Sequence, residues 1–171
     1  MYNKKMDKEK IIREYEKILE IPENKPKEKI MVCPIGIVGS GKTTVVKPLS
    51  ESLSLLIISS DEIRKFLKKN GCGYDLAGEI AFDLAEKYIE KKYKIKIFWI
   101  HINPPEEFII NKLKNYKHTW LFRDADQAIE NYKSSKANHQ NINFPFIYTF
   151  DTSRNDLGEQ IKEAISIIIE S

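Results

Sequence analysis

The sequence predicts an α/β fold in which a mostly parallel sheet is covered on both faces by helices. Short apolar runs, typical of buried strands, alternate with longer segments whose apolar residues recur at helical spacing. A glycine-rich turn joins the first apolar run to a helical segment. With 171 residues, the chain has the length of one domain with a substantial core.

The chain begins with an amphipathic helix and a polar linker. Over residues 8–20, Ile11, Tyr15 and Ile18 fall on one helical face, and charged residues occupy the other. Residues 22–29 are polar and interrupted by proline, which predicts a linker. We therefore divide the chain into residues 1–29, a helix with its linker, and a main domain at 30–171. The helix is expected to dock on its own domain, and partner binding is the alternative.

Strands and helices alternate through the rest of the chain. The apolar runs that predict strands are residues 30–33, 55–58, 95–102 and 146–150. Helical periodicity is found at residues 44–53, 60–67, 75–91, 106–113, 125–136 and 157–169. Ser59 and Glu62 have the spacing of a capping box, which marks a helix start. In such a fold, ligands bind outside the carboxyl ends of the strands.

A nucleotide-binding motif follows the first expected strand. Residues 36–43, hereafter the phosphate loop, read Gly-Ile-Val-Gly-Ser-Gly-Lys-Thr and match G-x-x-x-x-G-K-[ST]. Glycine lets several backbone N–H groups turn into one concavity, and the positive end of the next helix adds to its attraction for anions. We therefore expect the chain to bind ATP or GTP. The residues expected to hold the nucleotide are Gly36, Gly39, Ser40, Gly41, Lys42, Thr43 and Thr44.

Two side chains of this motif have distinct chemical roles. Lys42 is expected to reach the β- and γ-phosphates as a mobile point charge that also serves catalysis. The Thr43 hydroxyl is expected to coordinate a Mg²⁺ ion that bridges the same oxygens. A chance match in a glycine-rich turn is the alternative, and the strand-like run before the loop and the helical pattern after it disfavour that alternative.

Three segments together resemble P-loop kinases of the polynucleotide kinase, zeta-toxin and gluconate-kinase type. They are residues 36–44, the run 59–64 after the second expected strand, and Trp99-Ile100 leading into Pro105-Glu106-Glu107. The resemblance covers about residues 30–171. It implies the three-layer sandwich of a P-loop NTPase, and transfer of the γ-phosphoryl group of ATP to a hydroxyl acceptor.

The resemblance implies that Asp61 is the general base that takes the proton of the acceptor hydroxyl. An acidic side chain at the end of a strand beside the phosphate loop can reach such a hydroxyl, or a water on the metal, so Asp61 is also a candidate at the Mg²⁺ site. Arg64 falls on the same helical face and is expected to engage the acceptor or the transferred group. The alternatives are that Asp61 and Glu62 only complement a helix N-terminus, and that Arg64 is an exposed surface arginine.

Small kinases of this kind also close a lid that brings arginine onto the phosphates. We expect the lid at about residues 115–140, and Arg123, the only arginine of the stretch 117–126, as its catalytic group. An ion pair with Asp124 or Asp126 is the alternative for Arg123. After the last strand, residues 151–154 resemble the family's segment near the adenine, which makes Thr152 and Arg154 candidates for base contacts.

One part of the family pattern has no counterpart in the sequence. Such kinases carry another strand, ending in an acidic residue, between the helix that ends near Ile89 and the strand that begins near Ile95. That strand lies between the one that leads into the phosphate loop and the one that delivers Asp61. We therefore expect either that a segment of roughly 20 to 30 residues is missing here, or that the sheet closes up to four strands.

Composition and charge narrow the function less than these motifs do. The net charge of +3 points to no particular partner, and we expect an ordinary solvated surface. No apolar run is long enough to span a membrane, and the N-terminus lacks a secretory signal, so we expect a cytoplasmic protein without a membrane partner. The two cysteines and three histidines lack metal-ligand or nucleophile spacing.

The sequence thus predicts an ATP-dependent P-loop phosphotransferase that uses Mg²⁺. Its expected acceptor is a hydroxyl, either the 5′-hydroxyl of RNA or DNA or that of a small metabolite. The alternative is a nucleotide-gated binding module, in which ATP orders the lid and the N-terminal helix recruits a partner without phosphoryl transfer.

Overall fold

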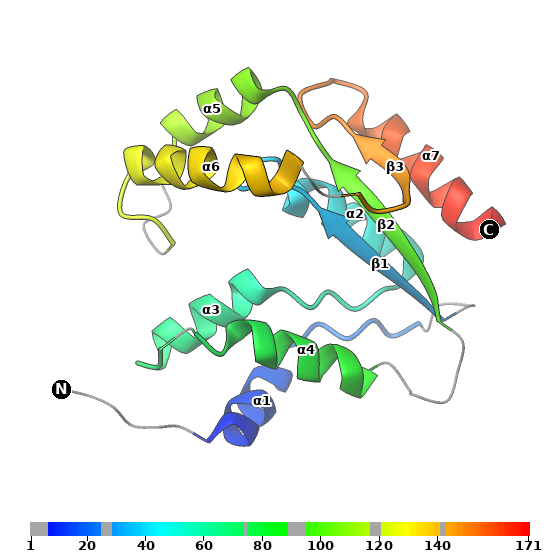
Figure 1. Cartoon of the computed structure of the whole chain (residues 1–171). Helices are drawn as coiled ribbons and strands as arrows, with labels where there is room; N and C mark the ends of the chain where they lie inside the picture. Colours follow the sequence, from blue (N-terminus) through cyan, green and yellow to red (C-terminus); the bar gives the residue numbers. More distant parts are fainter. Residues whose placement is uncertain (1–6, 25–28, 74, 89–94, 117–120, 141–142) are drawn as a thin grey trace. The chain divides into compact units, whose positions relative to one another are not determined.

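The computed structural model describes residues 7–24, 29–73, 75–88, 95–116, 121–140 and 143–171. Over these residues, seven helices and a parallel sheet of three strands form an α/β structure, as predicted (Figure 1). The chain falls into two compact units. Unit 1 comprises Met1–Lys25 and Leu56–Ile95, and unit 2 comprises Pro26–Leu55 and Lys96–Ser171. The expected boundary at residues 29 and 30 adjoins residues 25–28, which lie outside the described ranges, and that division stays a prediction.

Unit 1 is helical and contains α1 (Lys8–Glu16), α3 (Ser60–Lys69) and α4 (Ala77–Tyr88). Its core is formed by buried residues of all three helices, namely Ile11, Tyr15, Ile63, Leu67, Ala77, Ile80 and Leu84. The apolar face of α1 therefore packs on its own unit, which favours docking over recruitment of a partner. The helix ends at Glu16, earlier than expected, because the chain tightens into successive turns between residues 15 and 21.

The start of α3 follows the predicted capping pattern. Ser59 is the N-cap, and its hydroxyl oxygen accepts a hydrogen bond from the backbone N–H of Glu62 at 3.4 Å. Helix α4 is described as far as Tyr88, and its expected continuation to residue 91 lies outside the described residues. Unit 1 thus presents Asp61 and Arg64 on the first two turns of a capped helix.

Unit 2 is built on a sheet of three parallel strands in the order β1 (Ile30–Ile35), β2 (Lys96–Ile102) and β3 (Phe146–Phe150). Ile30 pairs with Lys96, and Ile35 pairs with His101. The pairing of β2 with β3 shifts by one residue between Trp99 and Ile100. Strand β1 lies at an edge of the described sheet, a position that tolerates the missing N–H of Pro34.

Helices α2 (Lys42–Leu53) and α7 (Leu157–Glu170) pack on one face of this sheet. The buried side chains between them and the strands are Val45, Leu49, Ile100, Ile102, Phe150, Ile161 and Ala164. A neighbouring cluster of Leu53, Phe98 and Ile168 extends this core. Because alternate residues of a strand point to opposite faces, Trp99 and His101 lie on the other face, where their rings stack on Phe144 and Phe146.

Helices α5 (Glu106–Lys114) and α6 (Ala125–Gln140) form a pair that packs on the phosphate loop (Figure 1). Their shared cluster contains Ile37 of the loop together with Ile109, Leu113, Phe122, Ala128 and Tyr132. The helix predicted at 125–136 therefore exists and runs four residues further than expected. This packing fixes one side of the phosphate loop against a rigid helical pair.

The prediction of a strand at residues 55–58 is wrong. These residues form neither helix nor strand, and the sheet of the described residues contains three strands, not four. Their apolar side chains are used in packing instead, since Leu55 joins the cluster around Phe98 whereas Ile58 joins the core of unit 1. A short apolar run predicts burial, and burial by itself does not require strand pairing.

The sheet has therefore not closed up to four strands within the described residues. The other possibility, a missing strand and helix, concerns the junction at residues 89–94, which lies outside the described residues. None of the described helices is both long enough and apolar enough to cross a membrane.

Candidate nucleotide-binding site

The backbone of the phosphate loop depends on its glycines. Gly39 and Gly41 have φ angles of 81° and 90°, in the left-handed region that glycine adopts without steric cost. At Gly36 the constraint is space, because a Cβ atom there would lie 2.6 Å from Ser40 Oγ and 2.8 Å from the carbonyl oxygen of Ile102. The three glycines of the motif thus meet two requirements, positive φ at Gly39 and Gly41 and space at Gly36, of the turn between β1 and α2.

The N-terminus of α2 is prepared for an anion. Gly41 is its N-cap and supplies no side-chain hydrogen bond, so the first N–H groups of the helix have no side-chain acceptor at the cap. The first turn of α2 also contains no acidic residue, whereas the first turn of each of the six other helices in the described residues does. Lys42 adds a positive charge where the helix dipole is already positive, and a bound anion would compensate both.

Two polar side chains of the loop point back over it. Lys42 Nζ donates hydrogen bonds to the carbonyl oxygens of Gly36 at 2.7 Å and Ile37 at 3.0 Å. Ser40 is fully buried, and its Oγ, which faces Gly36, has no hydrogen-bond partner among the described residues. A buried hydroxyl without a partner is costly unless a ligand supplies one.

Thr43 and Thr44 are exposed on the first turn of α2. The Thr43 hydroxyl is therefore accessible for the expected Mg²⁺ coordination, which needs few protein ligands because phosphate oxygens and waters supply the others. The described part of the chain gathers no group of three or more His, Cys, Asp and Glu side chains that could hold a metal.

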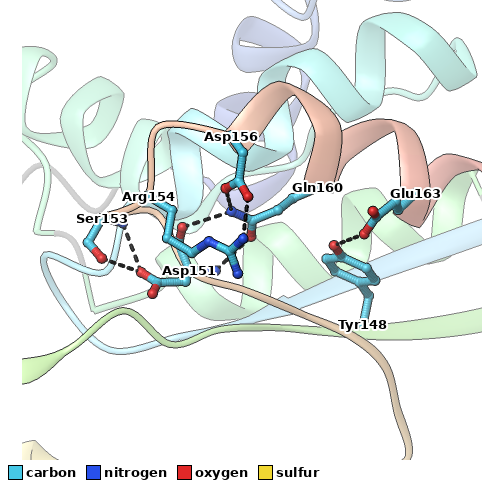
Figure 2. A network of polar contacts seen from close by, with 7 residues as sticks. All are labelled: Tyr148, Asp151, Ser153, Arg154, Asp156, Gln160 and Glu163. Atoms are coloured by element: carbon cyan, nitrogen blue, oxygen red, sulfur yellow. Dashed lines mark hydrogen bonds and ion pairs between the residues drawn. The ribbon is translucent and has the colours of Figure 1, made fainter.

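The turn after β3 contacts the other side of the loop. Thr152 Oγ1 donates a hydrogen bond of 2.7 Å to the carbonyl oxygen of Ser40, and its side chain packs against Gly41. Arg154 is ion-paired with Asp156 on the same turn (Figure 2). The structure thus brings Thr152 to the phosphate loop, as a contact of the protein backbone, while base contacts by Thr152 and Arg154 stay predictions.

Asp61 and Arg64 belong to unit 1, whereas the phosphate loop belongs to unit 2. The two side chains meet each other, with Arg64 Nη1 at 2.7 Å from Asp61 Oδ1. Both are partly exposed. Such an exposed pair one helical turn apart is worth only a few tenths of a kcal/mol, so it leaves the carboxylate free to exchange its partner for a ligand.

Arg123 precedes α6 and is 82% exposed. Its Nε donates to Asp124 Oδ2 at 2.8 Å, which is the ion pair named as the alternative to a catalytic role. Helix α6 has 16 residues and so spans about 24 Å. Phe122, the residue before Arg123, packs in one cluster with Ile37 of the phosphate loop, whereas the role of Arg123 in a closing lid stays a prediction.

His139, in the last turn of α6, lies near enough to Lys42 for its pKa to respond to the ammonium, which sequence analysis did not predict. Burial lowers the pKa of its imidazole, and the nearby Lys42 ammonium lowers this pKa further. Burial also lowers the pKa of His101, with His139 as the second cause. The predicted helix ended at Lys136, and nothing in local spacing predicts that the pKa of His139 responds to Lys42.

The sequence was also compared with known proteins. No protein-family model and no curated protein matches it. The motif and the geometry that the chain builds around it therefore carry the functional interpretation.

Proposed function

We propose that unit 2 has the P-loop NTPase fold and binds a nucleoside triphosphate, ATP or GTP, at the phosphate loop. One observation carries the proposal: the motif Gly36–Thr43 is a left-handed glycine turn that leads into a helix whose first turn is basic, uncapped by a side chain and free of acid. The buried Ser40 hydroxyl, which has no hydrogen-bond partner within the described part of the chain, supports the proposal. The parallel sheet is compatible with this fold, and the phosphate loop follows its edge strand β1.

In this proposal each loop residue acts on the phosphates. The N–H groups at the start of α2 bind the oxygens of the β-phosphate, and Lys42 leaves the carbonyls of Gly36 and Ile37 to neutralise the β- and γ-phosphates. Thr43 is the residue that would hold Mg²⁺. When bound, this ion neutralises charge on the transferred group.

We further propose that the chain is a kinase that transfers the γ-phosphoryl group to a hydroxyl acceptor, such as the 5′-hydroxyl of RNA or DNA or that of a small metabolite. Asp61 takes the proton of the acceptor, Arg64 holds the acceptor or the transferred group, and Arg123 stabilises charge on the equatorial oxygens. The exposed Asp61–Arg64 pair supports this assignment, since a ligand can replace either partner at little energetic cost.

A nucleotide-gated binding module is the second candidate. One observation favours it: Arg64 and Asp61 neutralise each other on the surface of α3, so a role in helix stability accounts for both side chains. In this case the chain binds ATP and transfers nothing.

Phosphoryl transfer separates the two candidates. The protein is incubated with γ-labelled ATP, Mg²⁺ and a panel of 5′-hydroxyl oligonucleotides, nucleosides and sugars. We expect one acceptor class to become labelled, and we expect Asp61→Asn to abolish labelling while ATP affinity is retained, because the side chain keeps its size and loses its basicity. Glu62→Gln, on the same exposed turn, is the matched control.

Labelling by Asp61→Asn at the wild-type rate would exclude Asp61 as the base. ATP binding without any labelled acceptor would favour the binding module. Absence of ATP and GTP binding to the wild-type protein would refute both candidates.

A further inference from the structure

The turn that follows β3 is built around one buried amide. Gln160 of α7 is only 5% exposed. Its Oε1 accepts a hydrogen bond of 2.9 Å from the backbone N–H of Asp151, and its Nε2 donates to the carbonyl oxygen of Asp151 at 3.1 Å. The same Nε2 donates to Asp156 Oδ1 at 2.8 Å (Figure 2). One side chain therefore holds both ends of the turn 151–156.

The turn is also stiffened from within. Asp151 Oδ1 accepts hydrogen bonds from the backbone N–H of Ser153 at 2.9 Å and from its hydroxyl at 2.6 Å. Asp156 pairs with Arg154 across the turn, as Figure 2 shows. Thr152 lies within this turn, and its hydroxyl is the group bonded to Ser40 of the phosphate loop.

This bond fixes a donor of the phosphate loop. The peptide between Ser40 and Gly41 is planar and trans, so its N–H points away from the direction of its C=O. Because Thr152 holds the Ser40 carbonyl at 2.7 Å, the N–H of Gly41 must point away from Thr152. Thr152 also packs on the left-handed Gly41, where a Cβ atom would lie 3.0 Å from Thr152 Oγ1.

We propose that the turn 151–156 is a clamp that orients the phosphate loop, with Thr152 and Gln160 as positioning residues that set its affinity for polyphosphate. The inference rests on the proposed function, since it assumes that the loop binds a phosphate chain. It differs from the expected base contact, because the Thr152 hydroxyl acts on the protein backbone and its effect does not depend on a nucleobase.

The test compares two ligands and two variants. Thr152→Val keeps the shape of the side chain and removes the hydroxyl, whereas Thr152→Ser retains it. We expect Thr152→Val to weaken the binding of ATP and of inorganic tripolyphosphate, both with Mg²⁺, by the same factor of about three- to tenfold. Thr152→Ser is expected to keep most of the wild-type affinity for both ligands. Calorimetric titration measures both. Thr149→Val, at an exposed position of β3, is the control.

A second readout needs no ligand. Amide hydrogen exchange of the segment 36–45 in the free protein is expected to become faster in Thr152→Val and in Gln160→Met, and to stay unchanged in Thr149→Val and in Lys162→Met, an exposed site on α7. Melting temperatures of Thr152→Val and Thr149→Val are compared, so that a general loss of stability is recognised.

A loss confined to ATP, with tripolyphosphate unaffected, would show that Thr152 contacts the base and would overturn the clamp. Unchanged exchange in Thr152→Val would overturn it as well, as would faster exchange with unchanged affinity. If the wild-type protein binds neither ligand, the proposed function fails and the clamp's effect on affinity fails with it. Hydrogen exchange then still decides whether the turn holds the loop.

Discussion

At the scale of single residues, Lys42 gives the most direct test of phosphate binding. Lys42→Ala is expected to weaken ATP binding by about ten- to a hundredfold, the usual effect of losing one charge-assisted hydrogen bond. The hydrogen bonds that the ammonium donates to the carbonyl oxygens of Gly36 and Ile37 lie within the loop itself. Fluorescent-nucleotide titration measures the affinity.

Lys47→Ala is the matched control for this substitution, since Lys47 is an exposed lysine on the same helix. Equal affinity of the Lys42 variant and the wild-type protein would remove the phosphate loop from the site. Equal losses in both variants would indicate a general effect of positive charge.

Residue identity predicted the backbone of the site better than its tertiary contacts. The motif located the glycines, and the structure explains them by positive φ at Gly39 and Gly41 and by crowding at Gly36. Local sequence could not predict that Thr152 would bond Ser40, because the two residues are brought together by the sheet. The same is true of His139, whose neighbour Lys42 lies almost a hundred residues earlier in the chain.

At the scale of elements, His139 in the last turn of α6 and His101 on β2 are expected to make the free energy of unfolding depend on pH. The pKa values of His139 and His101 are lowered by burial first, and then by Lys42 and His139 respectively. The folded chain therefore binds fewer protons than the unfolded chain below about pH 6.5, the ordinary pKa of histidine. The two neutral histidines therefore leave the free energy of unfolding at its full value above that pH, and this free energy decreases as the pH falls below it.

We accordingly expect the free energy of unfolding to decrease between pH 7 and pH 5, and to decrease less in His139→Gln. Urea unfolding at each pH measures both. His118→Gln, which replaces another histidine of the same chain, controls for the loss of an imidazole. Parallel curves for His139→Gln and the wild-type protein would show that His139 does not sense this pH range.

Among the elements, periodic segments were predicted well and the short run 55–58 was not. The strand at 146–150 and the helices from 106 onward agree with the structure to within a few residues, because their apolar periods are long or their ends are marked. The run 55–58 is apolar because its side chains serve two different cores. The sequence predicts that these side chains are buried, but it does not predict whether their backbone pairs with another strand.

At the scale of the whole molecule, the two units differ in how far apart along the chain their contacts lie. Unit 1 is held largely by α3 and α4, which follow one another, whereas β1 of unit 2 must find β2 on the order of 60 residues later. Contacts between distant residues form slowly, because the chain loses the entropy of loop closure before these contacts stabilise it. We therefore expect helical circular dichroism to recover before the fluorescence of Trp99, which lies on β2, measured by stopped-flow refolding in a Trp120→Phe background. Coincident recovery of the two signals would contradict this order.

The chain leaves unit 2 at Leu55 and re-enters it at Lys96. Leu55 packs in the same cluster as Ile30 and Phe98, and Ile30 pairs with Lys96. Residues 56–95 thus form an insertion into unit 2, and both ends of this insertion lie near Ile30. Doubling the length of such an insertion adds only about 0.6 kcal/mol to the entropic free-energy cost of loop closure. We therefore expect unit 2 and its phosphate loop to be almost unaffected when the segment 56–95 becomes longer or shorter, even by a strand and a helix.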